Sequence, residues 1–231
     1  MARRPAVTQI KNKFLVELQK SQAMYDAFES LPQKINPRVS SGIHPKHIHK
    51  SREMAFLEIV GAWEEFLEQS LVRYAMGVAT QTGYQPSMIG AAHSTRVLAY
   101  QAISLNPTYN PSVDFLSLSN PSCVTRIANR LFSLHPFACL GNRASLLNAA
   151  VNIRNRIAHK SSKSRAAFVG TAKWFLQPQN NQTPLSQGFS PGALLAKNAQ
   201  RHFGPALIQG GVTHFEAYLR LYEDLANKIV P

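Results

Sequence analysis

The fold class is decided by one long amphipathic stretch, residues 51–80, which reads SREMAFLEIVGAWEEFLEQSLVRYAMGVAT. Ser51 is a suitable N-cap for a helix. Apolar side chains recur every three or four positions, while Glu58, Glu65 and Gln69 lie on the opposite face. We expect a long helix whose apolar face forms the backbone of the core. That face consists of Phe56, Ile59, Val60, Trp63, Phe66, Leu67, Leu71 and Tyr74.

Helical periodicity recurs on both sides of this stretch, and no segment has the alternating pattern of a strand. Prolines and glycines punctuate residues 82–122, and residues 177–191 are polar and aperiodic, so we expect both to be loop insertions. The sequence therefore predicts an all-α bundle in a single domain, residues 1–231. The expected helices are 8–31, 51–80, 90–104, 122–133, 142–159, 163–177, 192–203 and a final one from about 212.

The charge balance is strongly basic, with 25 Lys and Arg against 12 Asp and Glu, a net charge of +13. Such an excess attracts polyanions, and nucleic acid is the commonest of them. A solvated basic surface and an acidic protein partner are the alternatives. Cys123 and Cys139 have neither disulfide nor zinc spacing, and no apolar run suits a secretory signal or a membrane span. We expect a reduced, cytoplasmic protein that does not contact a membrane.

The helix predicted over 142–159 has an unusual polar face. Ile153 and Ile157 lie on its apolar side, which we expect to dock on the core. A solvated helix face normally carries Glu and Lys, so a row of moderate helix formers suggests hydrogen bonding to a specific ligand. The row consists of Asn148, Asn152, Asn155 and His159, flanked by Arg154 and Arg156.

The run Arg154-Asn155-Arg156-Ile157-Ala158-His159 resembles the signature of the HEPN superfamily, an Arg, a polar residue, three further residues and a His near a helix end. More weakly, Trp63-Glu64-Glu65 is similar to the RiboL-PSP-HEPN group. The resemblance implies an HEPN-like helical bundle. It also implies a metal-independent endoribonuclease of the kind found in toxin–antitoxin and antiphage defence systems, with no cofactor.

The residues of this run suit RNA cleavage by attack of the 2′-hydroxyl. Histidine titrates near neutrality, so His159 is the candidate acid or base. Arg154, with Arg156 in reserve, would bind the charged phosphorane. The amide of Asn155 would fix the imidazole tautomer or hold a phosphate oxygen. The family implies products with 2′,3′-cyclic phosphate and 5′-hydroxyl ends. We expect the RNA backbone to be guided by Arg156, Lys160, Lys163 and Arg165.

One geometric condition limits this interpretation. On an ideal helix Arg154 and His159 point about 140° apart. They converge only if the helix ends near Ala158 or if a second subunit supplies one of them. Because HEPN proteins commonly dimerise around their motifs, the resemblance implies a homodimer with a shared cleft. The alternatives are a catalytically inactive RNA-binding or partner-binding module, and a protein that binds an acidic antitoxin or sensor.

Other polar and aromatic groups have ordinary interpretations. We expect His44, His47 and His49 to lie in a basic solvated loop rather than in a metal site. Glu64, Glu65 and Glu68 suit a solvated helix face, although one of them could reach the cleft. Trp63 and Trp174 are expected to anchor the core.

Overall fold

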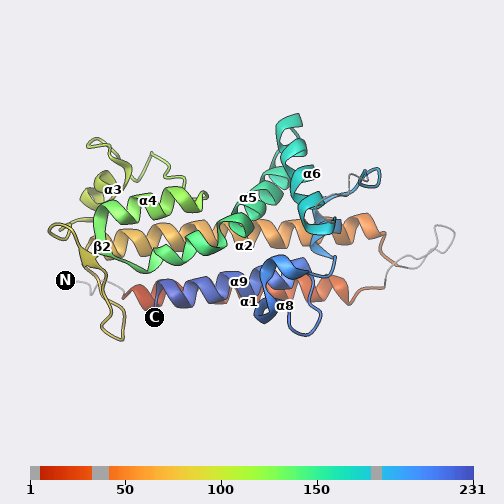
Figure 1. Ribbon diagram of the computed structural model, residues 1–231, viewed down its shortest axis with the longest axis horizontal. Coiled ribbons are helices and arrows are strands. Elements are labelled where there is room, and N and C mark those ends of the chain that lie inside the picture. Colours follow the sequence, from red (N-terminus) through yellow and green to blue (C-terminus); the bar gives the residue numbers. More distant parts are fainter. Residues whose placement is uncertain (1–5, 33–41, 178–183) are drawn as a thin grey trace. The chain divides into compact units, whose positions relative to one another are not determined.

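The computed structural model describes residues 6–32, 42–177 and 184–231, and it is 66% helix and 4% strand. The all-α prediction is confirmed (Figure 1). Within the described ranges, no helix has the length and apolar character needed to cross a membrane. The α-helices are α1 (Val7–Glu29), α2 (Pro45–Ala75), α3 (Arg96–Ser104), α4 (Pro121–Leu131), α5 (Ala144–Ala158), α6 (Ser162–Leu176), α7 (Pro191–Leu195), α8 (Pro205–Ile208) and α9 (His214–Ile229), with 3-10 turns η1 (Pro136–Arg143) and η2 (Arg201–Phe203).

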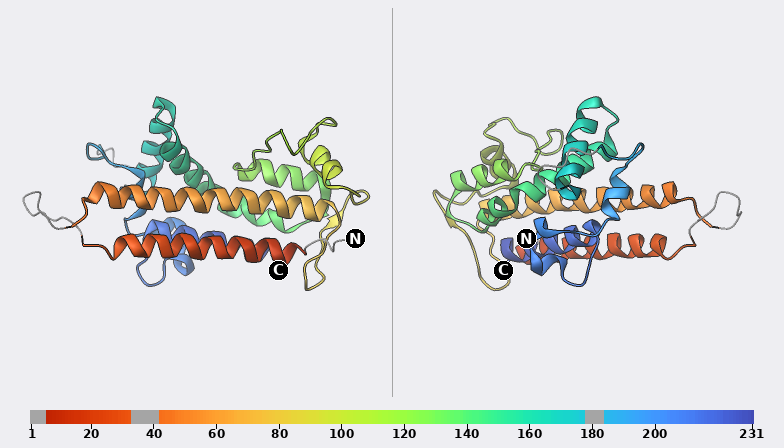
Figure 2. Two further views of the ribbon diagram at one scale, coloured as in Figure 1. Left: turned by 180° about the vertical axis from the view of Figure 1, so that it is seen from behind. Right: turned by 45° about the vertical axis from the view of Figure 1, so that its right-hand side comes forward.

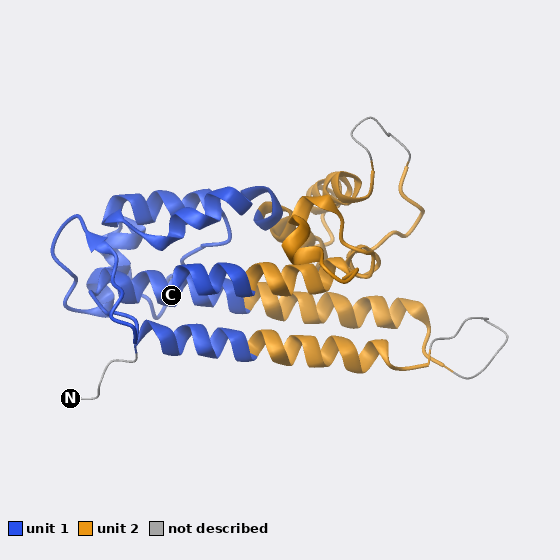
Figure 3. Cartoon of the chain, turned by 60° about the horizontal axis from the view of Figure 1, so that its bottom comes forward, with its two compact units in different colours: residues 1–16, 62–147, 223–231 blue, residues 17–61, 148–222 orange. Residues whose placement is uncertain are grey.

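The chain divides into two compact units, coloured separately in Figure 3. Unit 1 contains residues 1–16, 62–147 and 223–231, and unit 2 contains residues 17–61 and 148–222. Because α1, α2, α5 and α9 each cross a boundary, both units are built from segments that are distant in the sequence.

Unit 1 has an aromatic core. Phe14 of α1 packs against Trp63 and Phe66 of α2, with ring centroids 5.6 and 5.0 Å away. Farther along α2, the Tyr74 hydroxyl donates a hydrogen bond to the Ile229 carbonyl of α9 at 2.9 Å. Burial raises the pKa of Tyr74 above its usual range. The predicted apolar face of α2 is confirmed, since all eight of its side chains are buried.

The part of unit 1 between α2 and α5 differs from the prediction of an irregular connection. Two short strands, β1 (Ser87–Met88) and β2 (Phe132–Leu134), pair antiparallel. They are too short to produce an alternating pattern that sequence periodicity could reveal. The N-cap of α4 is Asn120, two residues before the expected Ser122, because the Asn120 side chain accepts hydrogen bonds from the backbone N–H groups of Ser122 and Cys123.

Unit 2 contains the last turns of α1 and the first turns of α2, which lie side by side in both views of Figure 2. Tyr25 of α1 stacks on Phe215 of α9 with centroids 4.2 Å apart. Phe56 of α2 contacts Tyr218 of α9 at 5.2 Å. Helix α6 follows α5 after the connection at residues 159–161 (Figure 1).

Helix α2 starts at Pro45, six residues before the predicted N-cap. Ser51 is buried within the helix, where its hydroxyl donates to the Ile48 carbonyl at 2.8 Å. Pro45 suits a first helical turn, and Ile48 is 1% exposed, so this turn has a core contact of its own. The prediction that His47 and His49 lie in a loop is therefore wrong, while His44 directly precedes the helix.

Candidate functional site

The junction between α5 and α6 carries the predicted motif. Helix α5 ends at Ala158, as the geometric condition on Arg154 and His159 requires. The backbone N–H of His159 still donates to the Asn155 carbonyl at 2.9 Å. Beyond it, Ser161 caps α6 by accepting from the Ser164 N–H. The Ser164 hydroxyl also donates to the His159 carbonyl at 2.8 Å. The backbone of His159 is thus fixed on both sides.

The side chains of the motif differ in exposure. Arg154 and Asn155 are half-buried, and Arg154 Nη1 donates to Asn155 Oδ1 at 3.1 Å. The Asn155 amide therefore orients the guanidinium rather than the imidazole. His159 is exposed immediately after the helix. The arrangement presents a held guanidinium and an accessible imidazole at one helix end, which suits phosphate binding and proton transfer.

The polar row on α5 has a partly structural explanation. Asn152 donates from Nδ2 to the hydroxyl of Thr171 in α6 at 3.1 Å, so it ties the two helices together. Asn148 is exposed. On the opposite side Ile153 is completely buried, as predicted, whereas Ile157 is only half-buried. Asn152 therefore has a structural role within the predicted row, and the ligand-binding role of the row stays a prediction.

A cavity of about 520 Å³ lies beside this junction, entirely within unit 2. It is bounded by the first turns of α2, the end of α5, one face of α6 and the segment 184–191. Three of the predicted RNA-binding residues line it, namely Arg156, Lys160 and Arg165, and Lys163 does not. Arg154, Asn155 and His159 are also outside its lining. The structure therefore separates the predicted residues into a motif group and a cavity group.

Two further cations line the cavity and were not predicted, Lys50 of α2 and Lys173 of α6. One carboxylate, Glu53, is present; it pairs with Lys50 at 3.3 Å and accepts from the Gly192 N–H at 3.2 Å. The sequence contains a signal for this basic region, since residues 115–215 include no Asp or Glu. The eleven basic residues in that run are Arg126, Arg130, Arg143, Arg154, Arg156, Lys160, Lys163, Arg165, Lys173, Lys197 and Arg201.

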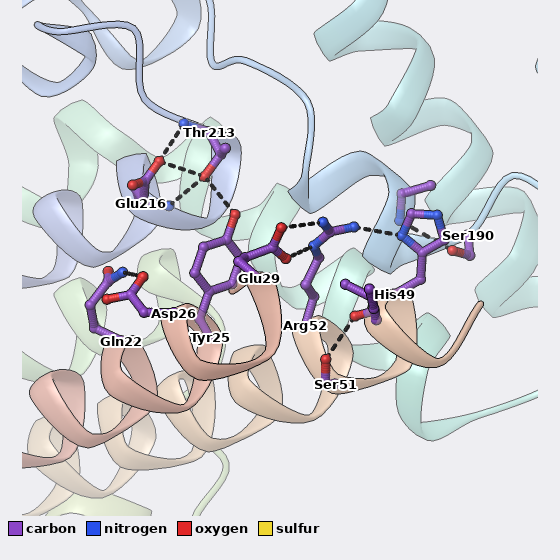
Figure 4. Close-up of polar contacts among 12 residues, drawn as sticks. Gln22, Tyr25, Asp26, Glu29, His49, Ser51, Arg52, Ser190, Thr213 and Glu216 are labelled. Carbon is purple, nitrogen blue, oxygen red and sulfur yellow. Dashed lines mark hydrogen bonds and ion pairs between the residues drawn. The ribbon is translucent and has the colours of Figure 1, made fainter. Parts of the chain in front are cut away.

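A closed polar network lies elsewhere in unit 2 and is drawn in Figure 4. Arg52 of α2 donates two hydrogen bonds to the carboxylate of Glu29 in α1, at 2.5 and 2.6 Å. Its third nitrogen donates to Nδ1 of His49 at 2.7 Å, so His49 is the neutral tautomer with the proton on Nε2. Burial and the Arg52 charge lower the pKa of His49. This histidine belongs to a structural ion-pair network.

The first turn of α7 is anchored to α2 by close backbone packing. A Cβ atom on Gly192 would lie 2.1 Å from the His49 carbonyl oxygen, so only glycine fits there. Ser190 caps α7 by accepting from the Ala193 N–H. This contact holds the end of segment 184–191, which is one wall of the cavity.

The remaining sequence candidates have varied outcomes. Trp63 is buried as predicted, whereas Trp174 is 38% exposed and its ring lies 4.1 Å from that of His202, so it does not anchor the core. Glu65 pairs with Lys13 on the surface. Glu68 accepts a hydrogen bond from Tyr100 and so contributes to the packing of unit 1. Across the described ranges, no group of three His, Cys, Asp or Glu side chains could hold a metal ion.

No protein-family profile, curated protein or solved structure matches this chain. The resemblance to HEPN proteins therefore stays a prediction from the six-residue motif.

Proposed function

We propose that the chain is a metal-independent endoribonuclease with an HEPN-like site at the α5–α6 junction. The observation that carries this proposal is the placement of His159, which is exposed and fixed through its backbone just where α5 ends, beside the Arg154–Asn155 pair. The basic composition and the cationic cavity next to the junction support a polyanionic substrate.

In this mechanism the RNA 2′-hydroxyl attacks the adjacent phosphorus, and the bond from phosphorus to the 5′-oxygen breaks. His159 takes the 2′ proton or protonates the departing 5′-oxygen. Arg154 binds the equatorial oxygens of the phosphorane, and Asn155 keeps its guanidinium in place. The products carry 2′,3′-cyclic phosphate and 5′-hydroxyl ends. A homodimer would place two copies of this site around one cleft and supply both an acid and a base.

Arg156, Lys160, Lys163 and Arg165 would guide the RNA backbone towards the junction in this proposal. As a cytoplasmic toxin or antiphage effector, the enzyme would require a restraining partner, and an acidic antitoxin or sensor protein would complement its charge.

The test is cleavage of end-labelled RNA by the purified full chain in the presence of EDTA, with product ends mapped and dimerisation followed by sedimentation. His159→Ala and Arg154→Ala should each abolish cleavage, while His47→Ala, a change at an exposed histidine of the same unit, should not. Thermal melts should show that all variants are folded. Cleavage that persists in both site variants, or that EDTA stops, would refute the proposal.

A second candidate, an RNA-binding module without catalysis, is favoured by one observation. The cationic cavity does not include the motif residues, so it can bind an anion without them. This candidate predicts salt-dependent RNA binding by the wild-type chain with no cleaved product.

A further inference from the structure

The cavity beside the junction has an uncompensated charge. Of its five cations only Lys50 pairs with the lining carboxylate, Glu53. No carboxylate in residues 6–32, 42–177 and 184–231 forms an ion pair with the other four cations. Like charges gathered around one cavity repel, and a bound anion relieves that repulsion. The four cations are Arg156, Lys160, Arg165 and Lys173.

Helix geometry makes this clustering specific. Arg165, Val169 and Lys173 follow one another at intervals of four on α6, so they share a face. Arg156 lies in the last turn of α5, and Lys160 lies in the connection that follows it. Lys163 belongs to the first turn of α6 and is exposed outside the lining. The cavity cations are therefore a defined subset of the basic surface.

The same cavity has an apolar side. Phe168 is 2% exposed, and its ring stacks with that of Phe189 at a centroid distance of 6.4 Å. Phe189 itself is half-buried and lies on the 184–191 wall. Ile157 and Leu185 add further apolar surface. A ligand that fills this space needs an apolar or aromatic group as well as several negative charges.

From this combination, the geometry points to a binding site for an organic polyphosphate, a small ligand with two or three linked phosphates on an aromatic or apolar group. The volume of about 520 Å³ lies within the range of small-ligand sites, roughly 300–1,000 Å³. In a linked di- or triphosphate each internal phosphate carries about one negative charge and the terminal phosphate about 1.5 to 2. An acidic peptide places about one charge per 3.5 Å of extended chain, so it matches four clustered cations less well. The site goes beyond RNA cleavage and does not require it.

Such a ligand has two possible sources, a free nucleotide and the 5′-triphosphate end of an RNA. The test uses ATP as the probe in calorimetric titrations of the full-length chain carrying His159→Ala, with EDTA present, so that binding is measured without cleavage. We expect saturable binding of one ATP per chain, weaker binding of inorganic triphosphate, and none of adenosine. Competition by an RNA with a 5′-triphosphate, compared with the same RNA bearing a 5′-hydroxyl, distinguishes the two sources.

Cavity variants and a matched control locate the site. Lys173→Gln and Arg165→Gln should each weaken ATP binding at least about fivefold, because each removes a charge-assisted contact. Lys197→Gln, which removes the same charge from an exposed position of the same unit outside the cavity, should change it less than about twofold. Thermal melts check the folding of each variant.

The proposal is overturned if ATP binding does not saturate, if Lys197→Gln weakens binding as much as the cavity variants, or if a poly-glutamate peptide competes as well as ATP. Because the readout is binding in a His159→Ala background, failure here is distinguishable from a failure of the endoribonuclease proposal.

Discussion

Unit 2 contains two groups that each combine an arginine with a histidine, and their surroundings differ. In the Glu29–Arg52–His49 network the guanidinium is 7% exposed and its charge is neutralised by a carboxylate. At the α5–α6 junction Arg154 is half-buried against an amide, and His159 is exposed. The histidine of the first group is therefore held in an ion-pair network, whereas the histidine of the second is exposed to solvent where α5 ends.

This difference follows from the distribution of acidic residues. A buried guanidinium must be paired, and α1 supplies Glu29 for that purpose. Residues 115–215 supply no carboxylate, so a carboxylate partner for the basic side chains of α5 and α6 has to come from another part of the chain, and Glu53 is the one that lines the cavity. The cavity cations Arg156, Lys160, Arg165 and Lys173 form no ion pair within the described residues, which distinguishes this binding surface from the structural network of the same unit.

Replacing each of the two histidines by alanine should give the largest effect, a difference in RNA cleavage. We expect His159→Ala to reduce RNA cleavage about a thousandfold, the scale of a lost acid or base, with little change in the free energy of unfolding. His49→Ala should retain cleavage within a few-fold and lower the free energy of unfolding by about 1 kcal/mol. Cleavage rates and urea unfolding of both variants measure the contrast. Equal loss of cleavage in the two would remove the distinction between them.

An arginine of the network and an arginine of the cavity provide the next comparison. Arg52→Ala should lower the free energy of unfolding by about 3 kcal/mol, because it leaves the Glu29 carboxylate without its buried partner. Arg156→Ala should cost less than about 1 kcal/mol, since Arg156 is half-buried and forms no ion pair with a carboxylate of residues 6–32, 42–177 and 184–231. Urea denaturation of both variants is the measurement, and a larger cost for Arg156 would contradict the assignment of roles.

A buried histidine sharpens the comparison through pH. His214 is completely buried against Phe175, and burial lowers its pKa to about 4. In the unfolded chain this histidine binds a proton near pH 6.5, whereas in the folded chain it stays neutral down to about pH 4. The free energy of unfolding should therefore decrease as the pH falls from about 6.5 to about 4, by up to about 3 kcal/mol. Urea unfolding across this range should be less pH-dependent in His214→Gln. If the stability of His214→Gln depends on pH as strongly as that of the wild type, His214 is not the source of the pH dependence.

The smallest effect concerns the connection between the helices. Ser161→Ala removes the N-cap of α6 and should lower the free energy of unfolding by about 1 kcal/mol. Ser162→Ala, at the next and exposed position, should have almost no effect. Thermal and urea unfolding compare the two. If Ser161→Ala leaves stability unchanged, the cap does not contribute to holding the junction.

Much of the helical fold was predictable because burial follows helical periodicity, as the eight buried side chains of α2 show. The errors in the helix starts came from local chemistry. Pro45 and Ile48 extend α2 towards the N-terminus, and Asn120 rather than Ser122 caps α4. The motif at 154–159 was visible in the sequence because its residues are adjacent. The cavity was not, because Lys50 and Phe189 reach it from distant segments and the 184–191 wall has no periodicity.

Gly192 affects the cavity through backbone packing. Since its α-carbon leaves no room for a methyl group against the His49 carbonyl, even alanine at this position would push the 184–191 wall away from α2. The position of this wall therefore depends on a close backbone contact as well as on the hydrogen bond between Gly192 and Glu53. A substitution there would enlarge the binding space while leaving every lining side chain in the sequence intact.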